Sequence, residues 1–95
     1  MVGEKRGLAP TRWGPCAWSF VHFVALGYPV KPLEEDVRAY AKFFDSLRYV
    51  LPCKSCRDNL DQHIADNPPD SALRQGRDAL FAWTVELHNN VNQSL

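Results

Sequence analysis

The sequence has only three cysteines in 95 residues and no excess charge, because eleven basic residues balance eleven acidic ones. Three cysteines are too few for a disulfide-rich secreted scaffold. Balanced charge gives no overall field that attracts nucleic acid or an anionic membrane. The longest apolar run is too short to span a bilayer, and the N-terminus lacks the apolar core of a signal peptide. We therefore expect neither a nucleic-acid nor a membrane partner.

Ninety-five residues make one small domain with a modest core, which a cofactor, a disulfide or oligomerisation would help to fold. The hydrophobic fraction of 45% is that of a globular protein. Residues 1–12 are polar and interrupted by glycine and proline, so we expect a flexible tail followed by a folded domain over residues 13–95.

Apolar residues recur with helical spacing nearly throughout, and no segment alternates as a strand does. The spacing predicts helices over about 15–26, 33–51, 53–65 and 77–93, with residues 71–76 as loop or a short turn. Pro15 suits the first turn of the first helix, and acids at 34–36 suit the start of the second. Short links favour antiparallel neighbours, so the predicted fold is an all-α four-helix bundle. Its core faces include Val37, Tyr40, Phe44, Leu47 and Leu51 in the second helix and Leu80, Trp83, Leu87 and Val91 in the last.

Cys53 and Cys56 form a CxxC motif at the start of the third predicted helix. Cysteines three apart on a helix face the same way and can alternate between disulfide and dithiol. The helix dipole, with Lys54 and Arg57 nearby, is expected to favour the thiolate. The pattern therefore predicts a redox pair.

Two other interpretations of the cysteine pair remain open. The pair is half of a zinc site if His63 or His88 completes it, although the chain has no second CxxC. In the second interpretation, the two cysteines are inert and have no role in redox chemistry or metal binding. A thioredoxin-type fold is disfavoured because its CxxC follows a strand in a βαβ context.

Two further groups of residues have the spacing of a ring-binding site. Trp18 and His22 lie four apart with Gly14 one turn earlier, so a flat ring could approach the backbone closely. His88 and Asn92 share a helical face, and asparagine inside a helix is a poor helix former that suggests a hydrogen-bonding role. The alternatives are a core tryptophan with a satisfied histidine, and a frayed polar C-terminal turn.

These motifs occur together in one order: Trp13-Gly14-Pro15 with Trp18 and His22, Tyr28-Pro29, Pro52-Cys53 with Cys56, Trp83, and His88-Asn89 with Val91 and Asn92. The ordered set resembles the Erv/ALR family of flavin-linked sulfhydryl oxidases over residues 13–92. The chain is most similar to the compact single-domain members, including those of large DNA viruses. It differs from many members at Pro15, where they have arginine, and at Val85, where they have a structural cysteine.

The resemblance implies a four-helix bundle that holds FAD non-covalently at its mouth beside the CxxC, and a homodimer through the first and second helices. It implies Cys53 and Cys56 as the catalytic pair, with Cys56 next to the flavin and Cys53 as the exchange thiol. No metal is implied. The implied cofactor-binding residues are Trp13, Gly14, Trp18, His22, Tyr28, Phe44, Cys56, His88, Asn89, Val91 and Asn92.

The implied activity is FAD-dependent oxidation of a dithiol protein, either thioredoxin-like or CxxC-bearing. A substrate thiolate attacks Cys53, expected to be the more accessible sulfur, and O2 finally takes the electrons to give hydrogen peroxide. A soluble protein of a cytoplasmic viral assembly site, of the mitochondrial intermembrane space or of a secretory lumen fits this chemistry, and one of the first two locations is expected.

Two other classes of protein are weighed against the enzyme. One is a non-enzymatic helical CxxC adaptor for redox or metal binding, which would need neither Trp18 with His22 nor His88 with Asn92. The other is a helical interaction domain that has lost activity. The leftover Cys16 is expected to be a small buried residue, with a bridge between subunits and an electron shuttle as alternatives.

Overall fold

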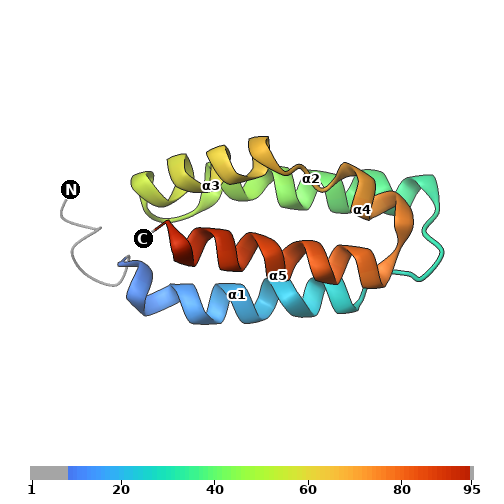
Figure 1. The fold of residues 1–95 in the computed structure, drawn as a ribbon, viewed down its shortest axis with the longest axis horizontal. Helices are drawn as coiled ribbons and strands as arrows, with labels where there is room; N and C mark the ends of the chain where they lie inside the picture. Colours follow the sequence, from blue (N-terminus) through green and yellow to red (C-terminus); the bar gives the residue numbers. More distant parts are fainter. Residues whose placement is uncertain (1–8, 95) are drawn as a thin grey trace.

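The protein is described here by a computed structural model that covers residues 9–94, and over that range every regular element is a helix (Figure 1). The four long helices are α1 (Pro10–Leu26), α2 (Glu34–Val50), α3 (Lys54–Asp66) and α5 (Arg77–Gln93). A short helix, α4 (Asp70–Gln75), occupies the segment for which the sequence left loop and turn open. The predicted all-α bundle is confirmed. Of the predicted tail, residues 1–8 lie outside the described part of the chain.

Helix α1 begins at Pro10, five residues before its predicted start, so Pro15 lies inside the helix. Residues 10–12 therefore belong to α1 rather than to the predicted tail. A proline at the first helical position costs little, because its fixed φ suits the helix and its missing N–H has no partner there anyway. The rule that places a proline at a helix start fits both prolines, and the prediction chose the wrong one.

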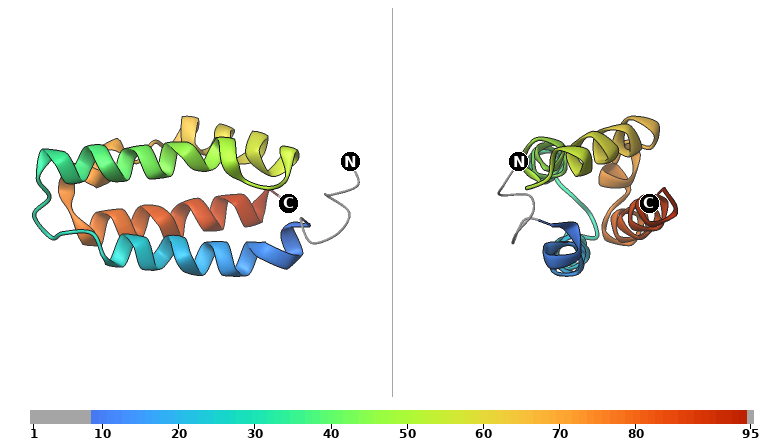
Figure 2. Two further views of the ribbon diagram at one scale, coloured as in Figure 1. Left: turned by 180° about the vertical axis from the view of Figure 1, so that it is seen from behind. Right: turned by 90° about the vertical axis from the view of Figure 1, so that its left-hand side faces the viewer.

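Helix α1 packs along α5 and α2 packs along α3, while α3 and α4 also contact α5 (Figure 2). Both predicted core faces are confirmed: their members are buried or pack against the buried cluster. The long helices thus enclose one apolar core. Its buried members are Val21, Ala25, Tyr28, Val37, Phe44, Leu60, Ile64, Leu73, Leu80, Trp83 and Leu87.

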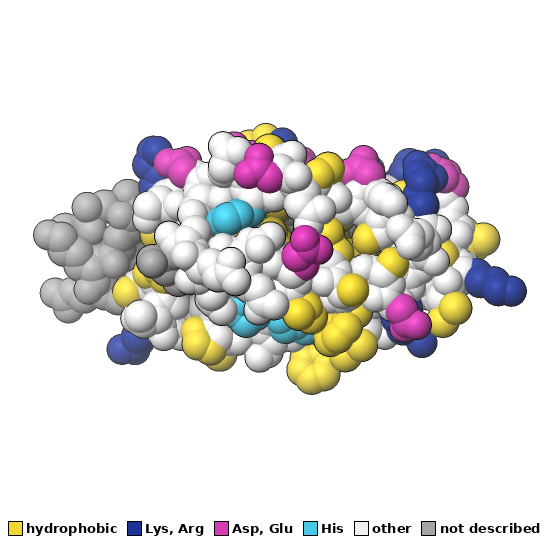
Figure 3. All heavy atoms as spheres, in the orientation of Figure 1, with side chains coloured by type: hydrophobic (Ala, Val, Ile, Leu, Met, Phe, Trp, Pro, Cys, Tyr) yellow, Lys and Arg dark blue, Asp and Glu magenta, His cyan; other side chains and the backbone are white. Residues whose placement is uncertain are grey.

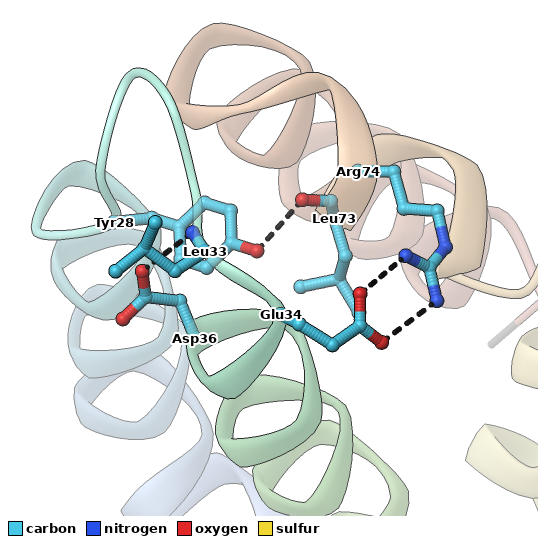
Figure 4. A network of polar contacts seen from close by, with 6 residues as sticks. All are labelled: Tyr28, Leu33, Glu34, Asp36, Leu73 and Arg74. Carbon is cyan, nitrogen blue, oxygen red and sulfur yellow. Dashed lines mark hydrogen bonds and ion pairs between the residues drawn. The ribbon is translucent and has the colours of Figure 1, made fainter.

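Polar contacts tie the α1–α2 connection to α4 and to the start of α5. The hydroxyl of the fully buried Tyr28 donates to the carbonyl oxygen of Leu73 at 2.7 Å (Figure 4). Arg77 Nε donates to the carbonyl oxygen of Tyr28 at 2.7 Å. On the surface Arg74 pairs with Glu34 at 3.0 Å. These contacts fix the end of the bundle that lies opposite the CxxC.

The surface of the described residues mixes charged and apolar side chains (Figure 3). Within residues 9–94, no helix combines the length and the apolar character needed to cross a membrane. Helix α1 exposes two large aromatic side chains, Phe20 at 60% and Phe23 at 70%. Hydrophobic side chains accordingly gather along the lower part of the face in Figure 3, over α1.

Candidate active site

The CxxC motif lies where the chain enters α3, as the sequence predicts. Cys53 is the N-cap of α3, and its sulfur accepts a hydrogen bond from the backbone N–H of Cys56 at 3.3 Å. The Ser55 hydroxyl lies 3.1 Å from the Cys53 sulfur. A capping cysteine satisfies a backbone donor that the first helical turn leaves without an intrahelical partner. The fold of this turn therefore fixes the distance between the two cysteines.

Accessibility of the two sulfurs differs from the expectation. Cys53 is buried, with 8% of its surface exposed, whereas Cys56 is half-buried and lines an open cavity. Leu51 and Pro52, each half-buried, precede Cys53 on the turn that leads into α3. In this structure Cys53 is thus not the more accessible sulfur.

The dithiol form of the pair also does not favour a thiolate at Cys56. Burial, reinforced by a hydrogen bond and electrostatic repulsion from Cys53, raises the pKa of Cys56 to about 11. The two cations expected to oppose this are engaged elsewhere. Lys54 pairs with Asp58 at 2.7 Å, and Arg57 donates to the carbonyl oxygen of Leu51 at 2.5 Å. Local burial therefore outweighs the helix dipole.

An open cavity of about 710 Å³ lies between α1, α5, the end of α2 and the start of α3. Its size falls in the range of small-molecule and cofactor sites. Apolar walls from Leu47, Leu51, Leu60 and Leu87 surround a few polar groups. The cavity brings together most of the residues predicted to bind a cofactor: Trp13, Gly14, Trp18, His22, Cys56, His88, Val91 and Asn92.

Three of the predicted cofactor residues do not line this cavity. Tyr28 and Phe44 are fully buried in the core, where Tyr28 bonds Leu73 and Phe44 packs edge-on against Trp83 at 5.2 Å. Asn89 is exposed on α5 beside His88. The geometry gives Tyr28 and Phe44 structural contacts instead.

Aromatic and histidine side chains form one wall of the cavity. The imidazole of His88 stacks on Trp18, with ring centroids 4.2 Å apart and planes 9° from parallel. His22 contacts the edge of the His88 ring, because its Nε2 lies 3.1 Å from His88 Nδ1. The other nitrogen of His22 lies 3.0 Å from the hydroxyl oxygen of Thr84. Histidines on α1 and α5 are therefore coupled across the helix interface.

Several residues of the site were not predicted. Leu47, Leu51, Ser55, Asn59 and Leu60 line the cavity from α2 and α3, and Thr84 supports the histidine pair from beneath. Thr84 lies four residues before His88, so helical spacing was the signal that could have found it. Leu47 and Leu51 were predicted only as core positions, and no motif marked Ser55, Asn59 or Leu60 as part of a site.

Nothing in the described part of the chain assembles three or more potential metal ligands. Nε2 of His63 lies 3.2 Å from the Ser94 hydroxyl oxygen, and His88 contacts His22. The two histidines considered as zinc ligands thus have other neighbours. Cys16 is exposed on α1, not buried as expected.

Fold and site together define a small helical protein with a CxxC in the wall of an aromatic-lined cavity. The model of the Erv1/Alr family matches residues 15–95, and the chain belongs to that family. The resemblance inferred from the motifs is therefore confirmed.

The relatives include viral and cellular proteins. The chain is 46% identical over 85 residues to a protein of Acanthamoeba polyphaga mimivirus described as a FAD-linked sulfhydryl oxidase, covering 90% of this chain and 59% of that protein. It is 29% identical over 82 residues to the mitochondrial FAD-linked sulfhydryl oxidase ERV1 of Saccharomyces cerevisiae, covering 86% of this chain and 42% of the relative. The chain thus spans about half the length of these curated relatives.

A solved structure has the same fold. The crystal structure of the yeast Erv1 core superposes with a TM-score of 0.80 at 27% identity, and the match covers 88% of this chain and 69% of that one.

Proposed function

We propose that the protein is an FAD-linked sulfhydryl oxidase that forms disulfides in dithiol substrates. One observation carries the proposal: Cys56 of the CxxC lies in the wall of the cavity that Trp18, His22 and His88 also line. A thiol beside a flat-ring site is the arrangement needed to pass electrons from a dithiol to an organic cofactor. Relatives named FAD-linked sulfhydryl oxidases support the choice of FAD.

The residues of the cavity fit a flavin. The stacked, nearly parallel Trp18 and His88 rings supply an aromatic wall, and Asn59 and Asn92 add amide groups to an otherwise apolar lining. Gly14 lines the cavity, and a Cβ built there would meet no atom of residues 9–94 within 4 Å apart from the neighbouring backbone of its own helix. Protein packing therefore does not require glycine at this position, whereas close approach of a ring would. Bound FAD would supply the two-electron chemistry and the route to O2.

The chain itself supplies the disulfide exchange. In the oxidised enzyme, a substrate thiolate attacks Cys53 of the Cys53–Cys56 disulfide and forms a mixed disulfide, with Cys56 as the leaving thiolate. A second substrate thiolate then attacks the substrate sulfur of that bond, releasing oxidised substrate and the Cys53 thiolate. Two electrons now reside on the cysteine pair. Their transfer to O2, with two protons, restores the disulfide and yields hydrogen peroxide.

The position of Cys56 supports our proposal for the roles of the two cysteines. Because Cys56 lines the cavity, a ligand bound there would cover it and leave Cys53 for the substrate. Cys53 is only 8% exposed, so its partner must be a thiol that can reach into a narrow site. We infer a dithiol on a protruding segment of a thioredoxin-like or CxxC-bearing protein. We propose a cytoplasmic viral assembly site or the mitochondrial intermembrane space as the location of the protein, because the relatives include a mimivirus protein and a mitochondrial yeast protein.

We further propose a homodimer formed through α1 and α2. Phe20 and Phe23 on α1 are 60% and 70% exposed, and Phe20 lies edge-on to Phe43 of α2 at 6.1 Å. Cys16 is exposed one turn before Phe20. An aromatic stripe of this kind is favourable to bury against a second copy. Gel filtration of Phe23→Glu should show a monomer where the parent elutes as a dimer.

A visible absorption spectrum of the purified full-length chain tests the function. We expect a yellow protein, or one that becomes yellow when FAD is added, and oxygen consumption with dithiothreitol. Cys56→Ser should keep bound FAD but lose turnover, because only the sulfur at the cavity is removed. A colourless protein that stays colourless with FAD would refute the proposal. Bound FAD without oxygen consumption would favour an inactive relative.

A further inference from the structure

A chain of hydrogen bonds runs from the backbone of α5 to the edge of the cavity. Thr84 Oγ1 donates to the carbonyl oxygen of Phe81 at 2.7 Å. His22 Nδ1 lies 3.0 Å from Thr84 Oγ1, and His22 Nε2 lies 3.1 Å from His88 Nδ1. Thr84 is fully buried, whereas both histidines are half-buried and line the cavity. These hydrogen bonds therefore link the buried hydroxyl of Thr84 to the His88 ring, which a ligand in the cavity could contact.

The chemistry of Thr84 sets the direction of the first two bonds. A hydroxyl has one proton, and the carbonyl oxygen of Phe81 can only accept, so the Thr84 proton lies between these two oxygens. Thr84 Oγ1 then has only lone pairs for His22. It follows that Nδ1 of His22 carries a proton and donates to Thr84.

The state of His22 sets the direction of the last bond. Burial, and secondarily the neighbouring His88, lowers the pKa of His22, so the ring is held neutral. A neutral imidazole with its proton on Nδ1 has an unprotonated Nε2. That atom must accept from His88, so His88 is protonated on Nδ1.

We propose that Thr84 and His22 are positioning residues that hold neutral His88 in its Nδ1–H tautomer and so leave Nε2 as a hydrogen-bond acceptor for the cavity. No residue of the described range 9–94 is bonded to His88 Nε2, and the stack on Trp18 occupies one ring face. The inference rests on the proposed function, because the ligand that meets this acceptor would be FAD. Nε2 selects a donor group of that ligand, an amino, imide or hydroxyl hydrogen.

Nitrogen-15 NMR of the histidine side chains in the full-length chain tests the tautomer directly. In alkaline buffer, we expect two-bond correlations that mark Nδ1–H at both His22 and His88. The measurement needs neither bound FAD nor turnover. Nε2–H at His88 in the parent protein would overturn the proposal.

A matched pair of variants tests the role of the buried hydroxyl. Thr84→Val keeps the shape but removes the acceptor for His22, so His88 should lose its single tautomer and FAD affinity should fall about tenfold, as for one lost hydrogen bond. Thr84→Ser keeps the hydroxyl and should restore the NMR pattern and bring FAD affinity within about twofold of the parent. Unchanged spectra and FAD affinity in Thr84→Val would count against the proposal. If Thr84→Val does not fold, the NMR spectrum of the parent protein alone tests the tautomer of His88.

Failure of the inference is distinguishable from failure of the proposed function. A parent protein that binds FAD but has His88 protonated on Nε2 refutes the tautomer assignment alone. A parent protein with the expected tautomer that binds no FAD leaves the hydrogen-bond chain intact and refutes the flavin assignment.

Discussion

The imidazole of His88 lies parallel to the indole of Trp18, with 4.2 Å between ring centroids and 9° between planes. The two rings come from α5 and α1, and the histidine edge is held at the same time by His22 at 3.1 Å. Stacking restricts the tilt of the imidazole, and the hydrogen bond restricts its rotation within the plane. One wall of the cavity is therefore rigid before any ligand arrives.

Replacing Trp18 should weaken ligand binding. Trp18 is half-buried and packs against the core without being part of it, so Trp18→Ala removes mainly the ring stack. A stacked aromatic pair is worth about 0.5–1.5 kcal/mol, so we expect FAD affinity to fall about two- to twelvefold. Fluorescence titration of FAD measures this. Trp18→Phe is the matched control and should keep most of the affinity. Equal losses in both variants would contradict a stacking role.

The thiol of Cys56 should react slowly in the reduced protein. Its pKa is raised to about 11, mainly by burial, from an ordinary value of 9.0. The thiolate fraction of Cys56 at neutral pH is then about a hundredfold smaller than in the unfolded chain. A thiolate of higher pKa is also a stronger nucleophile, which recovers part of the lost reaction rate. Alkylation should therefore be about tenfold slower than in the unfolded chain. Iodoacetamide labelling followed by peptide mass mapping, with and without urea, measures the ratio.

The same shift has a consequence for stability. The unfolded thiol ionises near pH 9 and the folded thiol near pH 11, so its contribution is complete below pH 9 and is lost as the pH rises towards 11. Cys56→Ser should therefore show a smaller fall in the free energy of unfolding over this range. Tyr28, whose pKa is also raised by burial, is present in both proteins and cancels in the comparison. Parallel curves for both proteins would show that Cys56 has no raised pKa.

The helical spacing of apolar residues, together with the prolines and glycines that interrupt it, was enough to predict the fold. Val37 and Phe44 on one face of α2, and Leu80 and Leu87 on α5, are buried as their spacing requires. These signals are local and repeat over several turns. The start of α1 was wrong because Pro10 and Pro15 satisfy the same rule, and choosing between them depends on contacts that the sequence does not show.

The sequence predicted most of the residues that line the site, but it did not predict the direction of the pKa shift at Cys56. Trp18, His22 and His88 meet at the cavity as expected. The pKa of Cys56 was misjudged because it depends on burial in the folded protein, which the spacing of residues in the sequence does not give. Thr84 was missed because a hydroxyl beside a core tryptophan resembles any buried threonine until His22 is placed against it.

Gly14 offers a substitution in which ligand binding and stability should change in opposite directions. A Cβ at this position meets no atom of residues 9–94 apart from the neighbouring backbone of its own helix, and alanine is about 1 kcal/mol better than glycine inside a helix. Gly14→Ala should therefore raise the melting temperature of the ligand-depleted protein by a few degrees. If a ring approaches the backbone there, FAD affinity should fall. Calorimetry and FAD titration give the two readings, and a variant that gains stability without losing affinity would show that no ligand occupies this space.

Gly76 is required by the backbone at the opposite end of the molecule. Its φ is 121°, a conformation that other residues rarely adopt, and an added Cβ would clash with the carbonyl oxygen of Val30. The clash involves backbone, which cannot move without disturbing the connection held by Tyr28 and Arg77. Gly76→Ala should therefore lower the free energy of unfolding by about 2 kcal/mol or more, which urea denaturation measures.

Gly27 provides the control for Gly76. It has an ordinary φ of −84°, and a Cβ there lies 3.5 Å from its nearest neighbour, the carbonyl oxygen of Val24, which is normal contact. Gly27→Ala should change stability by less than about 1 kcal/mol. Gly76 does not line the cavity, so its variant should bind FAD with parent affinity under conditions where it is folded. Equal stability of the two variants would show that the connection between α1 and α2 adapts freely to an added Cβ.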